Sequence, residues 1–434
     1  MTVRRSALAA YGTLFTALLT FTSSIPAQTP PALSTLYSFT GDLTGPYGGV
    51  VIGSGGVLYG TTQWAGTGSC ASGCGTVFSL TPPASPGGAW TETVIHNFAG
   101  YPTDGACPYA GVVIGSDGVL YGTTSQGGTA DQGVVFSLTP PASPGGAWTE
   151  AVLYNFSFGR GGQPYAGLVI GNGVLYGAAQ YGGPADAGAV FALTPPASPG
   201  GAWTEHVLYN FTGGSDGAEP SGGLAIGGRV LYGTTTRGGS ANSGTVYSLT
   251  PPLEAGGVWT QAVLHSFTGY PSDGANPWQG VAIGPGGVLY GTTVNGGPAD
   301  PDCGGSNGFC GGTVFSLTPP TAPGGAWNEA VLYSFTGSPN HQAAPYAGVA
   351  IGSGGVLYST TEGGGEPGDY GTAFALTPPT SLGGSWRYVL LHKFCESDGE
   401  WPFARLAMGR SGMLYGTTSG GGSSGAGTVF ALEP

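Results

Sequence analysis

Aromatic residues recur at one position of a repeated sequence motif, where their flat rings could stack on sugars or on other ligands with apolar patches. Six of the seven copies carry such a residue, and Ser221 is the exception. If the strands that begin with these residues line a central axis, the rings surround the mouth of a channel. The alternative is that each ring packs between neighbouring copies as ordinary core, as buried aromatics commonly do. The candidate ligand-binding aromatics are Tyr47, Tyr109, Tyr165, Trp278, Tyr346 and Phe403.

One arginine interrupts a row of glycines two residues after these aromatics. Six copies carry glycine there, which suits a crowded axis where backbones approach closely, and the seventh carries Arg405. Its guanidinium would offer a fork to a carboxylate or sulfate. Alternatively, Arg405 pairs with one of the acids nearby in sequence, which are Glu396, Asp398 and Glu400. Residues 387–410, which also include Trp401, depart most from the repeat, so we expect a binding site there.

A long loop in the fifth copy offers oxygen ligands of the kind that calcium prefers. Its sequence is PADPDCGGSNG, and the candidate metal ligands are Asp300, Asp302 and Asn307. The loop lacks the closing glutamate of a full calcium-binding loop, and we expect no other cofactor. Aspartates also recur before the aromatic strand in several copies, where they most simply cap their own turns. They are Asp104, Asp216, Asp273 and Asp398.

The titratable residues form no recognisable catalytic motif. Three histidines, at 96, 265 and 392, stand where other copies carry tyrosine, which predicts a packed position. Catalytic carboxylates would form a unique pair facing each other in a cleft, so four repeated glutamates are expected to be solvated charges on the outermost strand. They are Glu92, Glu150, Glu205 and Glu329. We therefore expect a binding protein, with a carbohydrate lyase or hydrolase as the alternative.

Six cysteines suit an exported protein in an oxidising compartment. Cys70 with Cys74, and Cys303 with Cys310, are candidate disulfides that would each close one loop. Cys107 and Cys395 would then form a third pair or remain free thiols.

The first 27 residues have the features of a secretory signal peptide. Arg4 and Arg5 precede a mostly apolar run, and a small-residue cleavage point follows at Ala27. The mature chain, residues 28–434, would keep seven basic residues against 22 acidic ones. Such a surface repels nucleic acid and anionic lipid. We expect a secreted or cell-surface monomer that does not insert into the membrane after cleavage.

A phrase close to VLYGTT organises the chain after residue 34, and it occurs seven times. Each copy contains about four short runs rich in Val, Leu, Tyr, Phe and Thr that are bounded by turn residues, as strands are. The second copy shows them at 108–115, 118–124, 133–140 and 148–156. This pattern predicts an all-β, seven-bladed β-propeller with four-stranded blades, in a single domain over residues 28–434. An open β-solenoid and a string of separate β-domains are the alternatives.

The last copy stops after three strands, whereas an unpartnered strand, TLYSFT, stands at Thr35–Thr40 before the first copy. Placing this N-terminal strand in the last blade completes the count and closes the ring without an open sheet edge. The loops joining strands two to three, and each blade to the next, vary most and carry all six cysteines. Because function concentrates on variable loops held by a rigid scaffold, we expect the ligand on their face.

The stretch DGANPWQGVAIGPGGVLYGTT, Asp273 to Thr293, followed by GGTVFSLTP, resembles the GloVer tandem repeat. That repeat marks a group of exported bacterial proteins described as choice-of-anchor proteins. The resemblance covers nearly all of residues 35–434 and implies an exported repeat protein, without supplying a substrate. No anchor segment follows Pro434 in this sequence, so attachment to the cell surface by that route is not expected.

These observations together predict a secreted propeller that binds extracellular polysaccharide or a surface protein through its variable-loop face. A structural matrix protein without a small ligand is a further alternative.

Overall fold

The computed structural model describes residues 31–41, 45–143, 145–159, 161–198, 200–254, 256–297, 311–322, 324–335, 343–365, 368–381 and 383–434. The expected signal peptide, residues 1–27, lies outside these ranges. The calcium candidates Asp300, Asp302 and Asn307 lie outside them as well, as do Cys303 and Cys310. Within the described part, no helix is long and apolar enough to cross a membrane.

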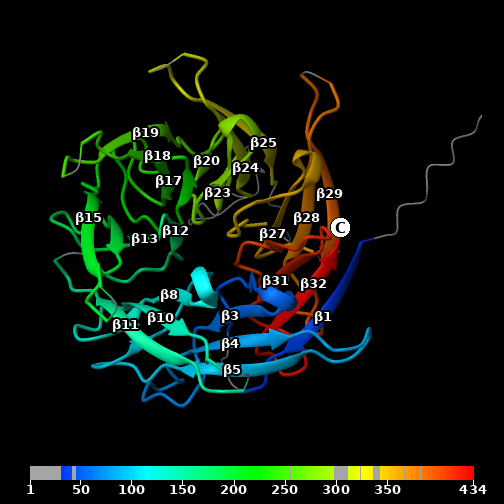
Figure 1. Cartoon of the computed structure of the whole chain (residues 1–434). Coiled ribbons are helices and arrows are strands. Elements are labelled where there is room, and N and C mark those ends of the chain that lie inside the picture. The colour runs from blue at the N-terminus through cyan, green and yellow to red at the C-terminus, as the bar shows by residue number, and fades with distance from the viewer. Residues whose placement is uncertain are drawn as a thin grey trace, which may run out of the picture. The chain divides into compact units, whose positions relative to one another are not determined.

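Seven four-stranded antiparallel sheets are arranged as the blades of a ring, which confirms the predicted seven-bladed β-propeller (Figure 1). We number the blades in chain order, so that blade 1 begins with β2. The innermost strands are β2 (Val51–Ile52), β7 (Val113–Ile114), β12 (Val169–Gly171), β16 (Ala225–Gly227), β21 (Ala282–Ile283), β26 (Ala350–Ile351) and β30 (Ala407–Met408). The second strands are β3 (Leu58–Thr62), β8 (Leu120–Thr124), β13 (Val174–Ala179), β17 (Val230–Thr235), β22 (Leu289–Thr293), β27 (Leu357–Thr361) and β31 (Leu414–Thr418).

The outer half of each blade is built from longer strands. The third strands are β4 (Thr76–Thr81), β10 (Val134–Thr139), β14 (Ala189–Thr194), β18 (Thr245–Thr250), β24 (Thr313–Thr318), β28 (Thr372–Thr377) and β32 (Thr428–Glu433). The fourth strands are β5 (Thr91–Asn97), β11 (Thr149–Asn155), β15 (Thr204–Asn210), β19 (Thr260–Ser266), β25 (Asn328–Ser334), β29 (Arg387–Lys393) and β1 (Ala32–Ser38).

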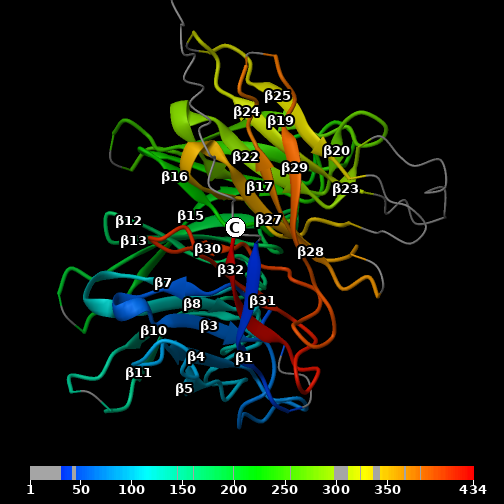
Figure 2. The ribbon, with the colours of Figure 1, turned by 90° about the vertical axis from the view of Figure 1, so that its right-hand side faces the viewer.

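The N-terminal strand completes the last blade, as the sequence predicted. β1 pairs antiparallel with β32, from Ala32 opposite Glu433 to Ser38 opposite Thr428. Figures 1 and 2 both show β1 beside β32. The backbone hydrogen bonds of this pair therefore hold the first and last described strands together and close the ring.

Threonines of the second strands join six of the seven blades to the next one, and blade 3 is the exception because it carries Ala178 at this position. The Oγ1 of Thr61 donates a hydrogen bond to the carbonyl oxygen of Ala110 in blade 2, at 2.9 Å. Thr417 donates in the same way to Gly48 of blade 1, at 3.1 Å, across the closure of the ring. The equivalent bonds come from Thr123, Thr234, Thr292 and Thr360. These bonds hold the innermost strands at fixed positions around the axis.

Aromatic pairs form the core between neighbouring blades. At every junction a ring that follows a fourth strand packs edge-on against a third-strand ring of the next blade, with ring centroids 5.0 to 5.3 Å apart. Edge-to-face contact at this distance is favourable for aromatic rings. The seven pairs are Phe39–Phe78, Phe98–Phe136, Phe156–Phe191, Phe211–Tyr247, Phe267–Phe315, Phe335–Phe374 and Phe394–Phe430.

Tyr247 is the one tyrosine among these third-strand rings, and its replacement by phenylalanine should stabilise the protein. Its hydroxyl is buried and has no hydrogen-bond partner. Leaving such a group unsatisfied costs about 1–3 kcal/mol. We expect Tyr247→Phe to raise the free energy of unfolding by about 1–2 kcal/mol, measured by chemical denaturation. Phe191→Tyr, which creates the same hydroxyl in blade 3, should lower it, and a Tyr247→Phe variant no more stable than the natural protein would contradict this account.

The two faces of the ring differ, because one carries short hairpins. In blade 3 the innermost hairpin turns at Asn172 and Gly173, with φ of 52° and 81°, which suits a tight two-residue turn. Four other blades use single 3-10 turns, which are η1 (Ser54–Gly56), η2 (Ser116–Gly118), η3 (Pro285–Gly287) and η5 (Ser353–Gly355).

The variable loops form the opposite face and carry two short ladders of their own. β6 (Gly105–Ala106) pairs with β9 (Gln126–Gly127), and β20 (Gly274–Ala275) pairs with β23 (Asn295–Gly296). Figure 2 shows β20 and β23 at the right, whereas β12 and β13, with their short hairpin, lie at the left. In blades 2 and 5 these ladders pair the loop between the second and third strands with the segment that enters the same blade.

Candidate functional site in the central channel

The six aromatic residues singled out in the sequence form a continuous arc around the axis. Neighbouring ring centroids lie 5.1 to 5.8 Å apart. Blade 4 interrupts the arc, because it carries Ser221 at this position. In order, the arc runs Tyr165, Tyr109, Tyr47, Phe403, Tyr346 and Trp278.

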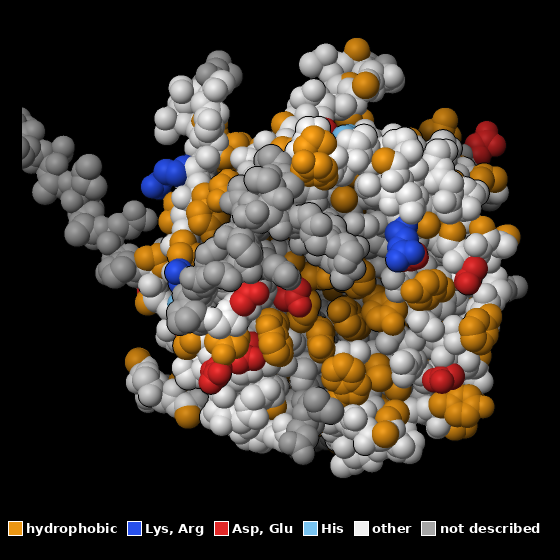
Figure 3. Space-filling model, turned by 180° about the vertical axis from the view of Figure 1, so that it is seen from behind, with side chains coloured by type: hydrophobic (Ala, Val, Ile, Leu, Met, Phe, Trp, Pro, Cys, Tyr) orange, Lys and Arg blue, Asp and Glu red, His pale blue; other side chains and the backbone are white. Residues whose placement is uncertain are grey.

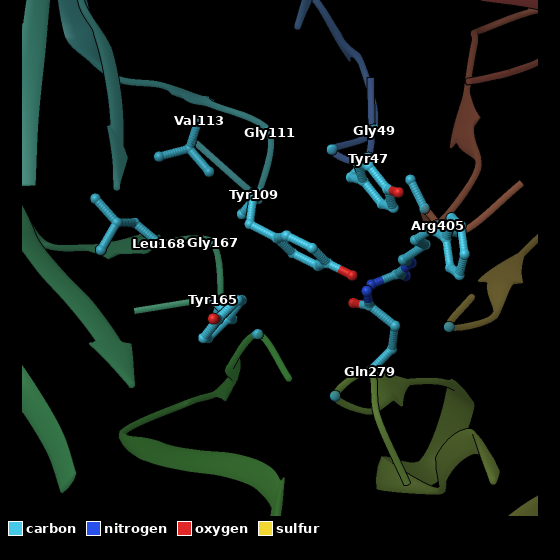
Figure 4. Close-up of a pocket in the computed structure, with 18 of the residues that line it drawn as sticks. Tyr47, Gly49, Tyr109, Gly111, Val113, Tyr165, Gly167, Leu168, Gln279 and Arg405 are labelled. Carbon is cyan, nitrogen blue, oxygen red and sulfur yellow. The ribbon is translucent and has the colours of Figure 1, made fainter. Parts of the chain in front are cut away.

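Five of the six rings line the central channel, and Tyr346 is not among the lining residues. Each is partly buried, and the interblade clusters of the described residues include none of them. Figure 4 shows Tyr47, Tyr109 and Tyr165 with their side chains in the open space between the blades. On the loop side, Trp64 packs edge-on against Tyr47 at 5.8 Å. The rings thus contact one another from blade to blade outside the buried core clusters, and those that line the channel are available to a ligand that enters it.

A cavity of about 380 Å³ continues from the arc along the innermost strands. Its walls run from the aromatic rings to Val51, Val113, Val169 and Ala407. The glycines noted in the sequence line the same space and leave it open, because they lack side chains. A cavity of this size is at the lower end of those that hold small ligands.

Arg405 extends into this cavity. Figure 4 shows its guanidinium facing the Tyr109 hydroxyl and the Gln279 side chain. The residue is exposed to the channel, but the protein atoms around the guanidinium partly desolvate it and lower the pKa of Arg405 from its ordinary value. No carboxylate among the described residues pairs with it. Two of the three expected partners bond elsewhere, since Asp398 contacts His392 and Glu396 accepts a hydrogen bond from Tyr370.

Gln279 is a channel residue that the sequence reasoning missed. It follows Trp278 and lines the cavity opposite Arg405. The other copies carry glycine or alanine at this position, for example Gly48, Ala110 and Ala166. Gln279 therefore departs from the repeat as clearly as Arg405 does, and that departure was the signal that could have identified it.

Glu362 is a second missed residue, at the loop side of the arc. Its backbone N–H donates to the carbonyl of Ala344, which fixes it directly after β27. Burial, and next the negative charge of Asp369, raise the pKa of Glu362 to about 7. After burial, Glu362 is in turn the charge that raises the pKa of Tyr47 and of Tyr346. A carboxyl group that is half protonated near neutral pH thus lies within electrostatic reach of the arc.

Trp401 lies outside the cavity, although its segment supplies Arg405. It precedes the seventh innermost strand, with φ of 56°, and its backbone N–H donates to the carbonyl of Tyr370. The side chain is 43% exposed. The structure therefore places Trp401 among the loops, where it could contact only a ligand that extends beyond the channel.

One of the candidate disulfides is confirmed. Cys70 and Cys74 are bonded and close a turn in the second-to-third loop of blade 1. Cys107 is buried and Cys395 is exposed, and both are free thiols in the described structure. The third pair considered from the sequence is thus not formed.

The recurring aspartates cap turns, as predicted, and three of them also contact the histidines of the fourth strands. Asp104 accepts hydrogen bonds from the backbone N–H groups of Ala99 and Gly105. The histidine Nε2 atoms lie 2.9 to 3.4 Å from the aspartate Oδ2 atoms in the pairs His96–Asp104, His265–Asp273 and His392–Asp398. Burial alone would raise the pKa of Asp273, but the His265 contact and backbone donors hold it below its ordinary value.

The prediction that the repeated glutamates are solvated edge charges is wrong. All four are partly buried. Burial, together with the negative charge of Asp104, raises the pKa of Glu150 to about 6. The Oε1 atoms of Glu150 and Glu329 are buried and have no hydrogen-bond partner. The segment that enters the same blade lies close to two of these glutamates, since after burial the charge of Asp104 contributes to the raised pKa of Glu150 and that of Asp273 to the raised pKa of Glu329.

Figure 3 shows the face opposite to that of Figure 1, on the side of the variable loops. Hydrophobic side chains gather near its centre, and acidic side chains lie beside them. This arrangement agrees with an aromatic arc at the axis.

Comparison with solved structures supports the fold. The Pseudomonas aeruginosa periplasmic gluconolactonase PpgL is 13% identical, with a TM-score of 0.50 over 87% of this chain and 96% of that chain. A fungal alcohol oxidase of the AA5 family, in complex with copper, is 14% identical, with a TM-score of 0.50 over 93% of this chain and 76% of that chain. At these identities the likeness concerns the fold alone.

No curated protein sequence matches the chain. The Gloeobacter/Verrucomicrobia repeat, however, matches residues 6–149, 143–303 and 302–434, which together span almost the whole sequence. The match agrees with the resemblance to the GloVer repeat and with the seven structural copies. The chain belongs to the Gloeobacter/Verrucomicrobia repeat family.

Proposed function

We propose that this protein is an exported, non-catalytic propeller that binds an acidic extracellular polysaccharide at its central channel. The observation that carries the proposal is the guanidinium of Arg405, which no carboxylate of the described residues pairs with, in a cavity lined by five of the six aromatic rings. Aromatic faces suit the apolar faces of sugar rings. The guanidinium fork suits a carboxylate or a sulfate. The hydroxyl of Tyr109 and the amide of Gln279 add donors and acceptors for sugar hydroxyls.

Export is part of the proposal and has two independent supports. The Cys70–Cys74 disulfide suits an oxidising compartment. The first 27 residues have the pattern of a secretory signal peptide.

The test is a binding screen of residues 28–434 against neutral, uronic and sulfated glycans. Arg405→Gly restores the residue that the other copies carry. It should weaken binding to acidic glycans about tenfold or more, since hydrogen bonds to charged groups contribute about 1.5–3 kcal/mol and 1.4 kcal/mol is about a factor of ten. Arg410→Ser, which removes an exposed arginine from the short-hairpin face, is the matched charge control and should leave binding unchanged.

Tyr109→Ala should weaken neutral and acidic glycans alike, because it removes a stacking surface instead of a charge. The absence of glycan binding, or binding that Arg405→Gly leaves unchanged, would overturn the proposal. If the protein bound a surface protein instead of a glycan, the variable loops would be a protein-binding surface. If the chain assembled without any soluble ligand, a matrix role would be indicated.

Glu362 favours a second candidate, a hydrolase acting on carbohydrate. A carboxyl group with a pKa of about 7 can act as a general acid near neutral pH. Such an activity would fall as the pH rises through about 7, because the protonated form is lost. In this case Glu362→Gln should abolish the release of reducing ends while binding persists. Glycan binding without any release of reducing ends would exclude this candidate.

A further inference from the structure

We propose that His265, Asp273 and Glu329 form a zinc site that ties blade 4 to blade 5 at the outer, loop-side edge of the ring. His265 belongs to β19 of blade 4, and Glu329 belongs to β25 of blade 5. Asp273 lies in the connection between the two blades. A bound ion would therefore join the outermost strands of neighbouring blades through side chains. The proposal is independent of the channel.

The spacing of the three groups fits a small cation. The Nε2 of His265 lies 3.1 Å from the Oδ2 of Asp273, and in the absence of an ion the two atoms share a hydrogen bond. One ligand atom from each of the three residues lies within 4.8 Å of the other two. Ligands at the usual zinc distances in a tetrahedral site are about 3.3 Å apart. Two of the ligand atoms already have this spacing, and Glu329 needs to move by roughly 1.5 Å at most, by this zinc geometry.

The polar contacts leave a place for such an ion. The Oε1 of Glu329 is buried and has no hydrogen-bond partner, which is costly for a carboxylate unless a cation or a donor compensates it. Asp273, in contrast, is held firmly, since the backbone N–H groups of Thr268 and Gly274 donate to its two oxygens at 2.8 and 2.7 Å. The Thr268 hydroxyl adds a further bond at 3.2 Å. Bonds of this kind orient a metal ligand.

The corresponding junction between blades 3 and 4 shows the alternative arrangement. There the same three positions hold Tyr209, Asp216 and Gln261. The Tyr209 hydroxyl donates to the Asp216 Oδ2 at 3.0 Å, and the Gln261 Nε2 donates to the Asp216 carbonyl at 3.3 Å. Hydrogen bonds within the chain thus satisfy this junction. Between blades 4 and 5, tyrosine and glutamine are both exchanged for metal-ligating residues, and an unpartnered carboxylate oxygen results.

The ligand types favour zinc over calcium. An imidazole nitrogen with two carboxylates suits zinc and related transition metals, whereas calcium and magnesium prefer sites made of oxygen ligands alone. His96, Asp104 and Glu150 repeat the same three residue types between blades 1 and 2, where the His96 Nε2 lies 3.4 Å from the Asp104 Oδ2 and the Glu150 Oε1 is buried without a hydrogen-bond partner. The compact set between blades 4 and 5 is the site that we propose.

The test uses chelator-treated residues 28–434 and titrates zinc by calorimetry, with thermal unfolding as a second measurement. The double variant H265Y/E329Q reproduces the Tyr209 and Gln261 arrangement that the protein already folds with. We expect zinc to bind and to raise the Tm by a few degrees, because a ligand that binds only the folded state stabilises it. The double variant should fold, bind one equivalent of zinc less and lose this Tm shift.

Two controls separate this site from incidental binding. His206→Ala removes an exposed histidine elsewhere and should leave zinc binding unchanged. Calcium added at the same concentration should not raise the Tm. The proposal would be overturned if H265Y/E329Q bound as many equivalents of zinc as the natural chain. It would also be overturned if His206→Ala lost the site, or if the natural chain bound no zinc.

Discussion

Gly280→Ala is expected to destabilise the protein severely, whereas Gly167→Ala, the same change at the same position of the repeat, should be tolerated. A Cβ atom on Gly280 would lie 1.7 Å from the carbonyl oxygen of Gly223 in the neighbouring blade. On Gly167 the nearest atom would be the Ala110 Cβ at 3.5 Å, which is ordinary contact. Both glycines line the channel, and neither has the positive φ that disfavours alanine. The difference therefore comes from backbone packing alone.

We expect Gly280→Ala to lower the free energy of unfolding by about 3 kcal/mol or more, since overpacking against a backbone cannot be relieved by a change of rotamer. Gly167→Ala should change it by less than about 1 kcal/mol. Denaturant titration of the two variants side by side measures the difference. Equal stabilities would mean that the innermost strands of blades 4 and 5 lie further apart than in this structure, and the channel would then be wider.

The fold could be predicted because the same strand pattern occurs seven times in the sequence. Seven copies of the VLYGTT phrase, with four strand-like runs each, leave few architectures open. The unpartnered Thr35–Thr40 then selects a closed ring over an open solenoid, since only a ring brings it to the last copy. The repeat also explains the arc, because residues in equivalent places of a propeller surround one axis.

The candidate site could be predicted only in part. Arg405 was found because it breaks the row of glycines, and Gln279 breaks the neighbouring row in the same way but was overlooked. Glu362 replaces residues as different as Gln63, Ser125 and Val294, so its position carries no pattern against which it stands out. Its raised pKa depends on burial in the folded ring, which no local pattern encodes.

Contacts between blades were the least predictable feature. The grouping of His265 with Glu329 requires the register of two outermost strands that are about 60 residues apart in the chain and belong to different sheets. Within one strand, Glu329 alternates with apolar residues and therefore has the pattern of a solvated edge charge. Glu329 becomes part of a partly buried cluster only because the segment that enters its blade, with Asp273, lies beside it.

Removal of the N-terminal strand should have the largest effect on the protein. Deleting residues 31–40 would take away β1, whose residues pair with β32 over its whole length, and Phe39, which is 4% exposed and packs on Phe78 of blade 1. The loss of a buried phenylalanine side chain alone costs about 3–5 kcal/mol, and a typical domain has a total stability of about 5–15 kcal/mol. The deletion would also leave the backbone groups of β32 unpaired at a sheet edge, which favours aggregation.

The matched control moves the strand instead of deleting it. In this variant, residues 31–40 follow Pro434 through a copy of the loop 82–90, so that blade 7 is built as blades 1 to 6 are. The deletion variant should aggregate or unfold without cooperativity, and the transferred strand should restore a cooperative transition, measured by thermal unfolding and size-exclusion chromatography. The Tm of the transferred form should stay below that of the natural chain, since β1 and β32 then belong to one hairpin and no longer join the two ends of the ring. A deletion variant as stable as the natural chain would contradict closure by β1, because six blades and three strands would then suffice.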